Sequence, residues 1–135
     1  MKSFIESAPF PLVIGLSVAG LLLNAGLVFV LCPSRKQRLT AAMGFVLGGV
    51  WIIPVGVLRG DSAKHIVVLY ADALLLVALI LIGLRADVRR VSVARAAGDR
   101  DIPPIPEARG RRVVYASMGL VVLVILLEYL PIWPF

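Results

Sequence analysis

The chain has 135 residues, 60% of them hydrophobic, and a mean hydropathy of +0.97. A soluble domain has about 45–50% apolar residues, so these values exclude an ordinary soluble domain and indicate several membrane spans. The formal net charge of +6 would suit nucleic acid, but the basic residues lie between apolar segments. That pattern predicts a role in membrane topology and no nucleic-acid partner.

Four long apolar segments predict an all-α membrane protein with four transmembrane helices in one bundle and one domain. Each segment is long enough to cross a hydrocarbon core of about 30 Å. The expected spans are about 11–31, 39–58, 65–84 and 113–133. Residues 85–112 form the one sizeable soluble segment. Its first part is predicted to extend the third helix until Gly98, after which Ile-Pro-Pro-Ile-Pro favours an extended chain.

The distribution of Lys and Arg predicts how the chain is threaded. Residues 33–38 carry three basic residues and residues 85–112 carry eight, and with four spans these two segments share one side of the membrane. The other side carries Lys2, Arg59 and Lys64. The positive-inside rule places the side with eleven basic residues in the cytoplasm and both termini outside. Arg outnumbers Lys 11 to 3, a composition typical of GC-rich bacteria, so we expect a bacterial inner-membrane protein.

Asp72 lies near the middle of the third span. A carboxylate at that depth costs at least about 2.5–3.5 kcal/mol on insertion scales, so it needs a partner or a proton. One interpretation is a proton- or cation-binding group in a transport path. The other is a buried polar contact that joins helices or subunits.

Glu128 lies in the outer half of the fourth span, at nearly the same depth as Asp72. Contact with interfacial water is the favoured interpretation for an acid that shallow. If the two helix faces meet, however, the two carboxyl groups could share a proton or a cation.

Small and polar residues predict the contacts between helices. Gly44 and Gly48 form a GxxxG pair, and together with Gly49 they predict a close helix contact, within the chain or with a partner. Asn24, near the middle of the first span, is expected to hydrogen-bond to another helix. The basic side chains of residues 85–112 are expected to contact anionic lipid headgroups or a soluble partner. They are Arg85, Arg89, Arg90, Arg95, Arg111 and Arg112.

The remaining residues limit the chemistry of the chain. Cys32 is the one cysteine and His65 the one histidine, so no disulfide, CxxC redox site or His/Cys metal site is predicted. We find no nucleophile–base pair and no phosphate loop, and therefore expect no cofactor and no enzymatic activity.

The leading functional hypothesis is therefore a non-catalytic accessory subunit that stabilises or tethers a larger membrane complex. Its expected partners are membrane lipids and other integral membrane subunits. The alternative is a small homo-oligomeric transporter or channel that uses Asp72, with Glu128 as a second candidate, for proton or cation coupling. A transporter needs Asp72 in a wet path, whereas a subunit can bury it against a neighbour.

Overall fold

The computed structural model describes residues 8–60 and 62–130, and within these ranges it contains five helices and no strand. Four of the helices are long and apolar enough to cross a membrane. For the described residues, the prediction of an all-α protein with four helices able to cross a membrane is therefore confirmed. The helices are α2 (Phe10–Leu31), α3 (Arg35–Leu58), α4 (Ala63–Gly83), α5 (Arg85–Ala96) and α6 (Glu107–Tyr129).

Local sequence signals explain where the helices begin. A proline lies in the first turn of α2. A backbone N–H at that position would have no partner within the helix, so proline, which lacks this group, costs no hydrogen bond there. At the start of α3 the Ser34 hydroxyl accepts a hydrogen bond from the Gln37 N–H at 3.1 Å. At the start of α4 the Ser62 hydroxyl accepts one from the His65 N–H at 3.2 Å. Both serines satisfy backbone donors that a helix start otherwise leaves free.

Two helices begin earlier than the apolar pattern predicts. α3 begins at Arg35 rather than at residue 39, and α6 begins at Glu107 rather than at residue 113. Hydropathy locates the part of a helix that crosses the hydrocarbon core, but the helix continues into its polar first turns. The helical extension of the third span is also interrupted, because Leu84 (φ −108°, ψ 18°) separates α4 from α5. Gly98, at a φ of +85°, follows the end of α5.

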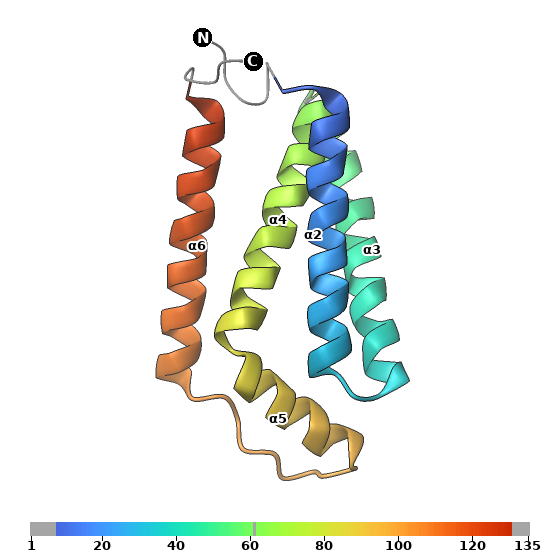
Figure 1. Cartoon of the computed structure of the whole chain (residues 1–135), viewed down its shortest axis with the longest axis vertical. Helices are drawn as coiled ribbons and strands as arrows, with labels where there is room; N and C mark the ends of the chain where they lie inside the picture. The colour runs from blue at the N-terminus through green and yellow to red at the C-terminus, as the bar shows by residue number, and fades with distance from the viewer. Residues whose placement is uncertain (1–7, 61, 131–135) are drawn as a thin grey trace.

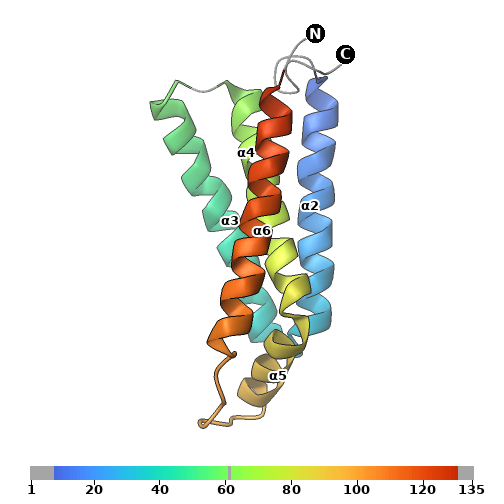
Figure 2. The same cartoon turned by 90° about the vertical axis from the view of Figure 1, so that its left-hand side faces the viewer.

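The four long helices run side by side, with α4 as their common neighbour (Figure 1). α4 contacts α2, α3 and α6, whereas α6 packs chiefly against α4. The view turned by 90° shows α6 in front of the other helices and α5 below them (Figure 2). The start of α2 and the end of α6 lie at one end of the molecule, and the α2–α3 turn and α5 lie at the other.

The tightest helix contacts occur at three glycines. A Cβ atom on Gly20 would lie 3.2 Å from the Leu74 side chain, and one on Gly56 would lie 2.5 Å from Ile66. A Cβ atom on Gly83 would lie 2.5 Å from Val113. Small residues thus bring α2, α3 and α6 close to α4, as is common where helices associate in lipid.

Candidate functional site

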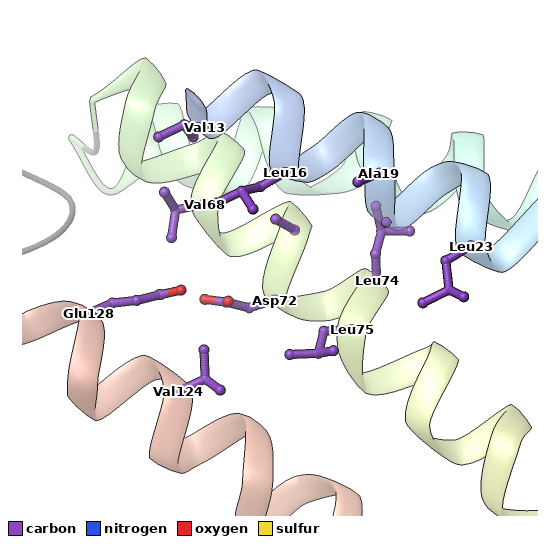
Figure 3. Close-up of a pocket in the computed structure, with 12 residues that line it drawn as sticks. Val13, Leu16, Ala19, Leu23, Val68, Asp72, Leu74, Leu75, Val124 and Glu128 are labelled. Atoms are coloured by element: carbon purple, nitrogen blue, oxygen red, sulfur yellow. The ribbon is translucent and has the colours of Figure 1, made fainter. Parts of the chain in front are cut away.

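Two acids from neighbouring helices meet inside the membrane-spanning part of the molecule. Asp72 of α4 and Glu128 of α6 are only 6% and 9% exposed. Figure 3 shows their carboxyl groups pointing toward one another. Within residues 8–60 and 62–130, neither acid forms an ion pair with Lys, Arg or His.

The pair has unused hydrogen-bonding capacity. Oδ2 of Asp72 and Oε2 of Glu128 are buried and have no hydrogen-bond partner in the described part of the chain. Two ionised carboxylates that face each other repel strongly where water is excluded. A proton on one of them removes that repulsion and allows the two groups to share a hydrogen bond. The pair is therefore suited to hold a proton, or a cation in its place.

The acids lie in an otherwise apolar pocket of about 320 Å³ between α2, α4 and α6. Small-molecule sites usually occupy about 300–1,000 Å³, so this pocket has the size of a small ligand site. Among the described residues that line it, Asp72 and Glu128 are the only charged ones (Figure 3). The apolar side chains around them include Val13, Leu16, Leu23, Val68, Leu75 and Val124.

At the end of the molecule opposite α5, α4 and α6 are joined by a second polar contact. The Tyr129 hydroxyl lies 3.1 Å from Nε2 of His65, and the two rings meet edge to face at 5.8 Å. Tyr129 directly follows Glu128 in the chain. A hydroxyl and an imidazole therefore lie between the acid pair and that end of the molecule. The sequence gave no signal for this contact.

The interface between α2 and α4 contains polar groups of a different kind. Asn24 is fully buried, and its Nδ2 donates to the carbonyl oxygen of Leu74 at 3.0 Å and to that of Gly20 at 2.8 Å. The Ser17 hydroxyl donates to the carbonyl oxygen of Val67 at 3.2 Å. These side chains bond to backbone oxygens and form no charged site, so their role is to hold α2 against α4.

The three glycines singled out in the second span differ in their surroundings. A Cβ atom on Gly49 would lie 3.4 Å from the Tyr70 ring, whose hydroxyl donates to the Phe45 carbonyl oxygen at 3.0 Å. A Cβ atom on Gly44 or on Gly48 would have nothing in the described chain within 4 Å. Their predicted close contact therefore remains a prediction about a partner molecule.

The predicted surface arginines divide into two groups. Four of them bond within the chain: Arg85 to the Ile82 carbonyl, Arg89 to the Val30 carbonyl, Arg90 to the Pro103 carbonyl and Arg111 to Glu107. The side chains of Arg95 and Arg112 form no hydrogen bond or ion pair with the described residues. Only these two keep their full bonding capacity for a lipid or a partner.

One structural ion pair was not anticipated from the sequence. Asp87, at the start of α5, is 7% exposed, and both its carboxylate oxygens accept hydrogen bonds from Nη1 of Arg109, at 2.8 and 3.0 Å. The contact joins α5 to the start of α6 and holds residues 85–112 as an ordered segment. The two residues are separated by 22 positions, so no local pattern could have paired them.

Comparison of the sequence with protein families and with curated proteins, and of the fold with solved structures, finds no match. Among the described residues, no group of three or more His, Cys, Asp and Glu could hold a metal ion. The acid pair and its pocket are the features on which a function can be argued.

Proposed function

We propose that this protein is a small membrane transporter that binds a proton or a cation at the Asp72–Glu128 pair. The observation that supports the proposal is the meeting of two buried acids in one apolar pocket. Intramembrane acids usually mark ion or proton pathways. A single such acid is also explained by a polar contact between helices, but two acids in contact add repulsion unless a proton or a cation compensates it.

Exchange is the mechanism that the geometry favours. With a proton between Asp72 and Glu128, the pair carries at most one negative charge. A cation that enters the pocket can replace that proton, because the proton and the cation each neutralise one negative charge of the pair. The walls are mostly apolar, and a low dielectric strengthens the interaction with either ion. Alternation between the two bound states is the basic requirement for proton-coupled transport of a cation.

The proposed orientation places the α5 end of the molecule in the cytoplasm of a bacterial inner membrane. The basic residues of α5 and of the first turns of α3 and α6 lie at that end, whereas Arg59 and Lys64 lie at the other. Both termini are then outside. A C-terminal alkaline phosphatase fusion should be active and a C-terminal green fluorescent protein fusion dark. The opposite pattern would invert the orientation.

The proposed function is tested with purified full-length protein in weakly buffered detergent solution and then in proteoliposomes. Addition of tetraphenylphosphonium, Na⁺ or K⁺ should release protons from the wild type in solution. In proteoliposomes, a gradient of the same cation should drive proton movement. Asp72→Asn and Glu128→Gln should fold and lose both signals. Glu107→Gln, which removes an exposed acid outside the pocket, should keep them. A wild type that shows neither signal with any of the three cations overturns the proposal.

The second candidate is the accessory subunit of a larger membrane complex. The observation that favours it is the open side of the molecule, since α6 packs chiefly against α4 and leaves the pocket between α2 and α6 without a closing helix in the described chain. A partner helix with a basic residue would fill that space and neutralise the acids. Blue-native electrophoresis of the untagged protein from its own membrane decides this. Migration with a larger complex supports the subunit, and migration as a small homo-oligomer contradicts it.

A further inference from the structure

A second pocket lies at the α5 end of the molecule, where α3 begins and α5 ends. It has a volume of about 640 Å³ and is lined by the first turns of α3, by α5 and by the turn before α3. Lys36 and Arg95 are its charged lining residues, and in the part of the chain that the structure describes no acidic residue lines it. Its polar walls are Ser34, Gln37, Thr40 and Ser92.

The two basic side chains approach this pocket from helices that are distant in the sequence. The fold brings the helices together through Gln37, whose Nε2 donates to the carbonyl oxygen of Ser92 at 3.0 Å. Neither Lys36 nor Arg95 forms an ion pair with the described residues. Two like charges are thus held at one cavity without a compensating acid, although Asp87, Asp99, Asp101 and Glu107 all lie in the same soluble segment. An anion is the ligand that this arrangement favours.

The lining groups and the position of the pocket indicate which class of anion it would bind. The Lys36 ammonium and the Arg95 guanidinium match a phosphate group, because it accepts several hydrogen bonds at once from charged donors. The pocket also includes Cys32 and Ala41, which lie just beyond the end of α2 and just inside the apolar part of α3. This is the level at which lipid headgroups meet a membrane helix.

We infer that the cavity between α3 and α5 binds a phosphate group through Lys36 and Arg95, and that an anionic phospholipid headgroup supplies it. The inference is independent of the acid pair, which lies between α2, α4 and α6. Arg95 was already a candidate for lipid contact from the sequence. The cavity adds Lys36, Gln37 and Ser92 and makes the contact a site rather than a general attraction to the surface.

The test uses full-length protein in nanodiscs of phosphatidylcholine with a small fraction of phosphatidylglycerol. The amount of phosphatidylglycerol that remains bound is measured by native mass spectrometry. The variant Lys36→Gln/Arg95→Gln removes the two charges of the cavity. Its matched control, Arg35→Gln/Arg100→Gln, removes two exposed charges outside the cavity at residues that were not predicted to contact lipid. Thermal unfolding verifies that both variants are folded.

Each basic residue near the membrane surface contributes about a fivefold gain in binding to anionic lipid, so the cavity variant should bind phosphatidylglycerol about 30-fold less tightly. The control should lose much less. Equal losses in both variants, or no loss in the cavity variant, would overturn the site. Nanodiscs of phosphatidylcholine alone, which contain no anionic lipid, are used to test whether the site instead binds free inorganic phosphate. Stabilisation by inorganic phosphate that disappears in the cavity variant assigns a soluble phosphate ligand and overturns the lipid assignment.

Discussion

The polar contacts that α4 makes with α2 and with α6, within the membrane-spanning part of the molecule, are built on opposite principles. Toward α2, Asn24 and Ser17 each donate to a backbone carbonyl of α4 at 3.0 and 3.2 Å. Toward α6, two acids face each other (Figure 3). Asn24, Asp72 and Glu128 each have one buried oxygen without a partner in the described chain, so the interfaces differ in the nature of the facing groups and not in unused bonding capacity. The first interface is neutral and bonded to backbone, whereas the second places two like groups in contact.

The difference shows which polar groups serve folding. A neutral amide or hydroxyl that donates to a carbonyl stabilises helix association in lipid by a modest amount and requires no change of protonation. Two acids in contact give little stability, because burial and mutual repulsion oppose the contact. The α2–α4 contact is therefore explained by structure alone, and the α4–α6 contact is better explained by a ligand. The following substitutions test that contrast.

The largest effect on stability is expected where a side chain would overlap its neighbour. Gly83→Leu places a Cβ atom 2.5 Å from Val113 and should destabilise the α4–α6 contact by about 1–3 kcal/mol through overpacking. Gly119→Leu is the control, since nothing lies within 4 Å of that position. Thermal unfolding in detergent measures both. Equal unfolding temperatures would show that α6 does not pack tightly on α4.

A smaller loss is expected at the neutral interface. Asn24→Leu removes the hydrogen bond to Leu74 and should lower stability by about 0.6–2 kcal/mol. Leu22→Ala, at a side chain that is 68% exposed to the lipid side, should have little effect on helix association. The same unfolding assay is used. If the Leu22 variant is the less stable of the two, Asn24 does not hold α2 against α4.

The weaker hydrogen bond of the same interface should have a smaller effect again. Ser17→Ala removes the bond to the Val67 carbonyl, which should cost at most about 0.6 kcal/mol. Ser117→Ala is the counterpart on α6, because Ser117 is also buried but donates no hydrogen bond to the described residues. It should unfold like the wild type. A greater loss at Ser117 than at Ser17 would contradict the contrast between the two interfaces.

The smallest effect on stability is expected from removal of both acids. Asp72→Leu/Glu128→Leu replaces two buried polar groups with apolar ones of suitable volume, a change that is commonly neutral or stabilising. The double variant should therefore unfold within about 0.5 kcal/mol of the wild type or above it. It should also lose the cation-dependent proton release described above. Marked destabilisation would show that the acids join α4 to α6, as in an accessory subunit.

The predicted spans and their ends show which features of the fold could be predicted from the sequence. The start of α2 in its proline turn, the end of α5 before Gly98 and the apolar core of each span depend on residues close together in the chain. These features were predictable within a few residues. The break at Leu84 was missed, because the residues on both sides of it favour a helix and only their packing decides its direction.

The amino-acid sequence by itself determined the number of membrane-spanning helices and the concentration of basic residues at one end. It also determined the presence of one acid in each of two spans. Only the tertiary structure decided that these acids meet, that Asn24 bonds to Leu74, and that Gly20, Gly56 and Gly83 rather than Gly44 and Gly48 lie at tight contacts. The physical reason is the solvent. Lipid tails are as apolar as leucine, so a membrane helix carries no hydrophobic stripe that fixes its rotation, and side-chain packing and polar contacts fix it instead.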